Sequence, residues 1–203
     1  MDGDYYYGDK ASETTFKNVS SEYQILHLAV HGDISDGESD FSRLVLSVED
    51  SIEDGQLHVF ELYNMKLNAD LAVLSACNSG AGKYQTGEGV MSLGHAFSFA
   101  GVNSLLLTRW DLSDEAAPEI MKTFYRELKQ GKSKSESLRT AQLEYLESAS
   151  VFRANPFYWG SFFVMGDDSP VKLPGTSWSY YWMFGFVLMV IVLSYFIRKR
   201  QLN

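Results

Sequence analysis

Cysteine is almost absent from this sequence. Cys77 is the only one among 203 residues, which excludes a disulfide framework within the chain and a zinc site built from several thiolates. Two roles remain for it. A free cysteine is usually a small buried hydrophobe, but a single thiol can also act as a nucleophile. The residues around Cys77 therefore have to distinguish between these roles.

Positive charge is also scarce. The chain has 17 Lys and Arg against 26 Asp and Glu, a formal charge of −9. Three of the basic residues are Arg198, Lys199 and Arg200, so residues 1–177 carry 14 basic and 26 acidic side chains, a charge of −12. Affinity for nucleic acid depends mainly on neutralising phosphates, and no basic stripe with interleaved aromatics is present to do so. We therefore expect no nucleic-acid partner.

One long segment has no charge at all. Residues 178–197 read "WSYYWMFGFVLMVIVLSYFI", and 20 residues of helix span about 30 Å, the thickness of a bilayer core. Aromatic residues at one end and the basic tail 198–203 at the other are typical of a membrane span. We expect a single transmembrane helix over 178–197, preceded by a linker over 168–177. The basic tail slightly favours placing the domain that precedes the helix outside the cytoplasm, whereas residues 1–10 show no signal peptide.

Continuous apolar runs predict four strands, at 24–30, 71–76, 102–108 and 161–165. A helical period lies between the second and third runs, with Val90, Leu93, Ala96 and Phe97 in its apolar stripe, so these two strands should be parallel. Two more helices are predicted at 113–131, capped by Ser113 or Asp114, and from Ser133 to about 148. Their stripes are Ile120, Met121, Phe124 and Leu128, then Leu138, Ala141, Leu143 and Leu146. Segment 32–70 suggests a strand at 43–48, a turn at 53–56 and a helix near 58–65. The fold class is α/β with a mainly parallel central sheet.

Three kinds of site compete for the loop "CNSGAGK" after the second strand. A nucleotide P-loop requires a glycine where Cys77 stands and a Ser or Thr where Tyr84 stands. A cysteine phosphatase requires an arginine at position 83, because its planar fork grips phosphate, and Lys83 offers only a point charge. The P-loop interpretation therefore fails at two positions, and the phosphatase interpretation is weak but still open.

The third reading pairs Cys77 with His31. Parallel strands joined by crossovers bring their carboxyl ends to one edge of a sheet, and each of these residues follows a predicted strand. An imidazole can move protons for a thiolate that attacks a carbonyl, and the backbone N–H groups of Gly32 and Cys77 can stabilise the oxyanion. This reading predicts a cysteine hydrolase.

The blocks that carry these residues resemble a known family. Four blocks are similar to the CHAT-domain cysteine peptidases, relatives of caspases and separase, across residues 5–167: "YYYGDKASETTFKNVSSEYQILHLAVHG", "ADLAVLSACNSGAG", "GEGVMSLGHAFSFAGVNSLLLTRWDLSDEAAPEIMKTFYRELKQGKSKSESLRTAQ" and "NPFYWGSFFVMGD". The resemblance implies a three-layer caspase-like fold over 1–167, His31 as acid/base, Cys77 as nucleophile, a protein or peptide substrate, no cofactor, and control by an upstream repeat sensor domain. Ser75 replaces the glutamine of the caspase motif, so the caspases' acidic substrate preference is not implied.

Several residues have ordinary alternatives. Trp110 and Asp111 follow the third strand, where related folds build the substrate pocket, but they could also be a packed aromatic and a helix-initiating acid. His27 and His31 are four apart, yet nothing nearby completes a zinc set, so no metal is expected and His27 is interpreted as a core histidine with a satisfied hydrogen bond. Glu88 is expected to cap the following helix rather than orient the active-site loop.

Two further expectations concern the chain as a whole. With only four strong strands, a strand that is normally central would lie at an edge, so we expect the domain to lack its N-terminal strands. The rival function, from another class, is a non-catalytic signalling scaffold held at the membrane.

Overall fold

The computed structural model describes residues 3–33, 42–49, 51–75, 88–110 and 114–173. The chain divides into two compact units, Met1–Val171 and Lys172–Asn203. Among the described residues, no helix combines the length and apolar character needed to cross a bilayer. The expected span over 178–197 lies outside those residues.

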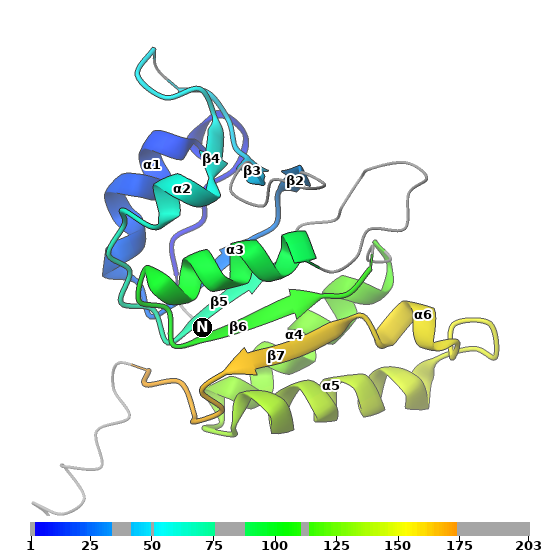
Figure 1. Cartoon of the computed structure of the whole chain (residues 1–203). Helices are drawn as coiled ribbons and strands as arrows, with labels where there is room; N and C mark the ends of the chain where they lie inside the picture. The colour runs from blue at the N-terminus through cyan, green and yellow to red at the C-terminus, as the bar shows by residue number, and fades with distance from the viewer. Residues whose placement is uncertain (1–2, 34–41, 50, 76–87, 111–113, 174–203) are drawn as a thin grey trace, which may run out of the picture. The chain divides into compact units, whose positions relative to one another are not determined.

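The main sheet of the first unit has the order β1-β5-β6-β7 (Figure 1). Its strands are β1 (Ile25–Leu28), β5 (Leu71–Leu74), β6 (Ser104–Thr108) and β7 (Phe162–Gly166). β1, β5 and β6 are parallel to one another, and β7 runs antiparallel to β6. The four predicted strands and the mainly parallel sheet are therefore confirmed.

Strand position in the sheet explains the burial of each strand. β5 and β6 have neighbours on both sides, and all of their residues are buried. β1 lies at an edge and alternates, with Leu26 and Leu28 buried and His27 exposed. The continuous apolar run at 24–30 predicted a strand buried on both faces, and this is wrong for β1, because a strand at the edge of a sheet is covered less completely than a central one.

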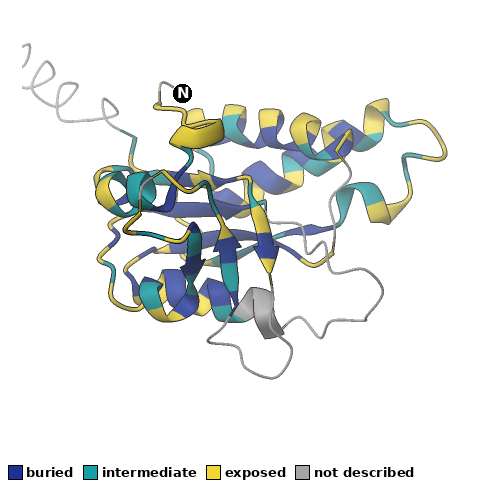
Figure 2. Cartoon of the chain, turned by 90° about the horizontal axis from the view of Figure 1, so that it is seen from above, coloured by how far each residue is buried: buried dark blue, intermediate teal, exposed yellow. Residues whose placement is uncertain are grey.

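Helices cover both faces of this sheet. α3 (Glu88–Phe99) connects β5 to β6 on one face, and α4 (Ala116–Lys129) and α5 (Lys134–Ser148) lie on the other (Figure 1). Their inner sides are buried and their outer sides exposed (Figure 2). The predicted stripes are confirmed on α3 at Leu93, Ala96 and Phe97, and on α4 at Ile120, Met121, Phe124 and Leu128.

The helix ends and one stripe differ from the prediction. α4 starts at Ala116, and its N-cap residue is Glu115, whose side chain makes no capping hydrogen bond. The N-cap therefore lies later in the chain than the predicted Ser113 or Asp114. On α5, Leu143 is 45% exposed and Tyr145 is buried instead, because 138, 141 and 145 follow the helical period and 143 does not. Ser133 does cap α5, since its side chain accepts a hydrogen bond from the Glu136 N–H.

A second, antiparallel sheet lies between β1 and β5 in the chain. It has the order β2-β3-β4, formed by β2 (His31–Asp33), β3 (Arg43–Val45) and β4 (Gln56–His58), followed by α2 (Val59–Leu62). The predicted short strand and helix of segment 32–70 are thus confirmed, and the turn contains Gly55 at a φ of +77°. β2 and β4 were not predicted.

The remaining elements are short. η1 (Gly8–Lys10), α1 (Glu13–Val19) and η2 (Ser20–Glu22) precede β1, and α6 (Pro156–Trp159) precedes β7. α1 was not predicted, although Ser12 caps it by accepting a hydrogen bond from the Thr15 N–H. A cap residue before only seven helical residues is a weak sequence signal because so short a helix depends on tertiary packing.

Candidate active site

The ends of β1 and β5 lie side by side in register. Leu28 is opposite Leu74, and the Ser75 N–H donates to the Leu28 carbonyl at 3.0 Å. His31 follows Leu28 by three residues and Cys77 follows Ser75 by two. Two residues of chain reach at most about 7 Å. Cys77 itself lies outside the described residues, so the structure brings together the strand ends that carry the pair, not the two side chains.

His31 is the first residue of β2 and is exposed. His31 follows β1, as expected, and after Ala29 and Val30 the chain enters a second strand. Val45 of β3 lies opposite His31 in the antiparallel ladder. Pairing with β3 therefore fixes the backbone at His31.

The N–H of Gly32 points away from β3, to the side of β2 that pairs with no other described strand. The Leu46 N–H donates to the Gly55 carbonyl and the Val59 N–H to the Ser42 carbonyl, so the even-numbered residues of β3 bond β4. The odd-numbered residues then bond β2 at positions 31 and 33. Gly32, paired with Leu44, therefore directs its N–H away from β3. This is the donor that the oxyanion role requires.

An ion pair stiffens β2 beside Gly32. Asp33 and Arg43 are directly opposite in the ladder, and Arg43 Nη2 lies 2.5 Å from Asp33 Oδ2. Both side chains are more than a third exposed, so the pair contributes little to stability. Sequence analysis missed it. The available signal was the alternation of polar side chains at His31 and Asp33 with glycine between them, which is typical of a short strand. It could indicate the pair only if β2 had been recognised as a strand.

Trp110 is held by the segment that precedes β7. Its Nε1–H donates to the Phe157 carbonyl at 2.9 Å, and its own carbonyl accepts from Ser161 Oγ at 2.8 Å. The side-chain N–H is thus already engaged, and Trp110 can offer a substrate only its ring, since the residue is 37% exposed. Asp111 lies outside the described residues.

His27 lies on the side of β1 that faces α4. Its Nδ1 is 2.9 Å from the Tyr125 hydroxyl, and the two rings are 5.7 Å apart. Neighbouring atoms exclude enough water to lower the pKa of His27 and raise that of Tyr125 above their ordinary values. The predicted hydrogen bond is confirmed, but part of the residue stays accessible, so His27 is not a core histidine. Its partner, Tyr125, is 98 residues away in the sequence, and no sequence pattern predicts this hydrogen bond.

Glu88 is the first residue of α3. The side chains of residues 88–91 are not described, so neither of the two roles weighed for Glu88, helix cap or loop positioning, is tested.

Three carboxylates approach each other away from these residues. Glu13, Glu53 and Glu61 offer oxygen atoms that lie within 4.8 Å of one another. The Lys17 ammonium already bonds all three, at 2.7, 2.8 and 2.7 Å. The carboxylates raise the pKa of Lys17 although burial opposes its charge. The cluster is an ion-pair network that joins α1 to α2 and to the segment before β4.

Comparison with known proteins agrees with the motifs. A family model described as the CHAT domain matches residues 4–167. The tetratricopeptide repeat proteins 28 of Mus musculus and Homo sapiens are each 28% identical to the chain over 149 residues, which cover 73% of this chain and 6% of each relative. The chain thus spans a small part of these relatives. Since the family match extends over most of its length, the chain belongs to the CHAT-domain family.

Proposed function

We propose that the chain is a cysteine peptidase in which Cys77 attacks the peptide carbonyl and His31 transfers the protons. The observation that carries the proposal is the register of β1 and β5, which places the residues preceding His31 and Cys77 next to each other, with Ser75 bonded to Leu28. Membership of the CHAT-domain family supports the same assignment.

The chemistry assigns one task to each group. His31 takes the thiol proton, and the thiolate of Cys77 adds to the carbonyl carbon to give a tetrahedral oxyanion. The edge N–H of Gly32 and the backbone N–H of Cys77 donate hydrogen bonds to that oxyanion. Protonated His31 then gives its proton to the leaving amine, and water hydrolyses the thioester with His31 as base. Each step balances without a metal or cofactor.

An acyloxymethyl ketone probe tests the dyad without knowledge of the substrate. We expect the chain to be labelled far faster than an ordinary thiol, Cys77→Ala to remove the label, and His31→Gln to slow it. His95→Gln is the matched control, because His95 is exposed on α3. Labelling no faster than that of a free cysteine, in protein shown to be folded, would favour the non-catalytic scaffold.

The Gly32 amide has a separate test. Gly32→Pro removes an N–H that β3 does not use, and proline is tolerated at such edge positions. Loss of one oxyanion donor costs about 10²–10³ in rate. We expect peptide cleavage to fall by that amount in protein shown to be folded. An unchanged rate would show that the Gly32 N–H does not contact the oxyanion.

We further propose that residues 178–197 anchor the enzyme in a membrane and that an upstream repeat domain controls it. Twenty residues without a charge support the first part, and relatives named tetratricopeptide repeat proteins support the second. Alkaline carbonate extraction tests anchoring: the chain should stay with the membrane and a chain ending at 177 should not. Protease added to intact spheroplasts should digest the catalytic domain if it lies outside, and protection would reverse the orientation.

A further inference from the structure

β7 is an edge strand with unused backbone groups. Among the described strands it pairs only with β6. The Arg109 N–H donates to the Ser161 carbonyl and the Asp167 N–H to the Asn103 carbonyl, both at 3.0 Å. By the alternation of an antiparallel ladder, the odd-numbered residues of β7 bond β6. Phe162 and Val164 therefore direct their N–H and C=O groups to the open edge, where another strand could bond them.

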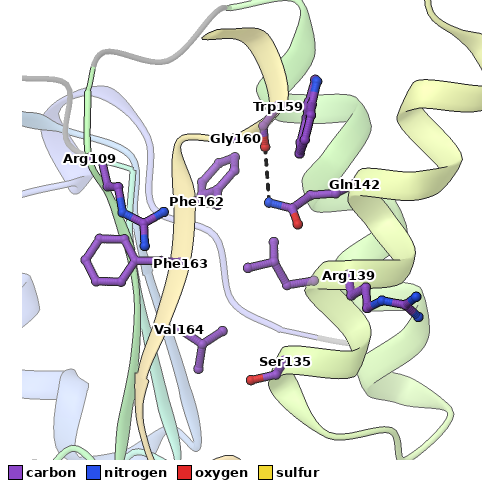
Figure 3. A pocket seen from close by; sticks show the side chains of 10 residues that line it. Arg109, Ser135, Arg139, Gln142, Trp159, Gly160, Phe162, Phe163 and Val164 are labelled. Atoms are coloured by element: carbon purple, nitrogen blue, oxygen red, sulfur yellow. Dashed lines mark hydrogen bonds between the residues drawn. The ribbon is translucent and has the colours of Figure 1, made fainter. Parts of the chain in front are cut away.

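A groove runs along this edge. It has a volume of about 380 Å³ and is formed by β7, by α5 and by the turn after α6. Its walls combine apolar side chains with polar ones. Figure 3 shows Phe162 and Val164 on the side of β7 that faces α5, and Phe163 with Arg109 on the other side. An extended segment lying along β7 would thus place successive side chains against two different surfaces.

Both ends of the groove are fixed by hydrogen bonds. At one end, the buried Lys134 donates to the carbonyls of Asp167 and Ser169, at 2.9 and 2.6 Å, which ties the end of β7 to α5. At the other end, Gln142 Nε2 donates to the Trp159 carbonyl at 3.2 Å. A binding edge held in place in this way loses little entropy when a segment docks.

Two arginines line the groove on a domain of strong negative charge. The Arg109 guanidinium lies 4.7 Å from the centre of the Phe163 ring. The Arg139 guanidinium lies at the rim, turned away from β7 (Figure 3). Within the described part of the chain, neither arginine has an ion-pair partner, and no carboxylate lines the groove. Their charge is therefore available to a ligand.

We propose that this groove binds an extended peptide segment of another protein that carries acidic side chains, and that the segment adds to the main sheet as a strand next to β7. Backbone bonding to Phe162 and Val164 gives the affinity. Arg109 selects one acidic side chain, and Arg139 selects the other by turning its guanidinium from the rim toward β7. Arg109 and Arg139 lie on opposite faces of the sheet edge, and successive side chains of a strand point to opposite faces. The two acids should therefore be separated by an odd number of positions in the segment, for example at adjacent positions.

A second copy of the chain fits the edge less well. Pairing two β7 strands would bring four arginines together. The carboxylates that directly follow β7 already accept hydrogen bonds: Asp167 Oδ1 accepts from Ser169, and Asp168 Oδ1 accepts from the Ser135 N–H at 2.6 Å. The four arginines would repel one another with no unengaged carboxylate beside them, which opposes self-association and favours an acidic partner.

The test uses the full 203-residue chain in a mild non-ionic detergent, with Cys77→Ala to prevent cleavage. The probe is a fluorescein-labelled heptapeptide of alternating valine and threonine with glutamates at its third and fourth positions, followed by anisotropy. Three control peptides carry lysines at those positions, glutamates at the third and fifth positions, or N-methyl groups on the backbone amides that would face β7.

We expect saturable binding of the adjacent-acid peptide, weaker binding of the spaced-acid peptide, and none of the lysine or N-methyl peptides. Arg109→Gln and Arg139→Gln should each weaken binding about fivefold, and Lys66→Gln, an exposed charge that does not line the groove, should not. Thermal midpoints check that the variants fold. A peptide affinity that is unchanged by the arginine substitutions, or by the N-methyl groups, overturns the proposal. Sedimentation showing a dimer that is lost on Val164→Pro, which removes an N–H from the edge of β7, with no peptide binding, would assign the edge to a second copy instead.

Discussion

Replacing Lys17 by methionine should destabilise the domain strongly, because Lys17 neutralises a carboxylate that water cannot reach. Glu13 is 1% exposed, and its Oε1 lies 2.7 Å from Lys17 Nζ. Its other oxygen, Oε2, is buried with no partner among the described residues. Glu53 and Glu61, which are about a quarter exposed, share the same ammonium. Methionine preserves the aliphatic stem and removes only the charge.

The magnitude follows from Glu13. Removing one partner of a buried ion pair costs about 3–5 kcal/mol, and the partial exposure of the other two acids places this case near the lower limit, at about 3 kcal/mol. A domain of this size shifts its thermal midpoint by about 2–4 °C per kcal/mol, so the midpoint should fall by about 6–12 °C. Because the cluster connects α1 to the segment before β4 and to α2, the sheet that carries His31 and Gly32 should loosen with it.

Thermal unfolding followed by circular dichroism at pH 8 measures this effect. Lys66→Met is the control for loss of an exposed positive charge and should shift the midpoint by less than about 2 °C. The double variant Lys17→Met with Glu13→Gln should recover part of the loss, since no buried charge is then left unpaired. The raised pKa of Lys17 means that its contribution is complete below about pH 10 and lost as the pH rises further. A midpoint of Lys17→Met equal to that of Lys66→Met would refute the reasoning.

Two other predictions concern glycine geometry and pH. Gly101→Ala should cost at least about 3 kcal/mol in unfolding free energy, because Gly101 has a φ of +106° and an added Cβ would lie 2.2 Å from the Leu67 carbonyl oxygen. The control Gly131→Ala, at a φ of +82° in open space, should cost only about 1 kcal/mol. Equal losses of unfolding free energy in urea titrations would contradict the predicted clash. Burial lowers the pKa of His27, so the unfolded chain takes up a proton below about pH 6.5 that the folded chain resists, and stability should fall as the pH drops through that range. His27→Phe should flatten this dependence between pH 7.5 and 5.5, and an unchanged slope would show that other groups cause it.

The sequence was most informative where local pattern and burial agree. The runs at 71–76 and 102–108 predict β5 and β6 because fully buried parallel strands contain hardly any polar residue, and the spacing of Phe124 and Leu128 predicts the inner side of α4. The α3 crossover then requires β5 and β6 to be parallel. The meeting of the β1 and β5 ends follows from the same topology, which is why His31 and Cys77 could be paired before the register was known.

Features that depend on long-range pairing could not be predicted. β2 has three residues, and it exists because Val45 and Arg43 of β3 lie opposite His31 and Asp33. The direction of the Gly32 N–H depends on which residues of β3 bond β4, a fact that no local pattern contains. The same holds for the acids around Lys17, which come from three separate segments. Pairing partners, not propensities, decide these features.

The central claim is that Cys77 and His31 together hydrolyse peptide bonds. The most direct measurement is mass spectrometry of a degenerate peptide library incubated with the full chain, together with its Cys77→Ser and His31→Ala variants, each first shown to be folded. We expect the parent chain to cut a defined subset of peptides and both variants to lose at least about 10³-fold in rate, because the residues of such a dyad act as a unit. Cleavage of the same peptides by the Cys77→Ser variant at the parent rate would contradict the assignment.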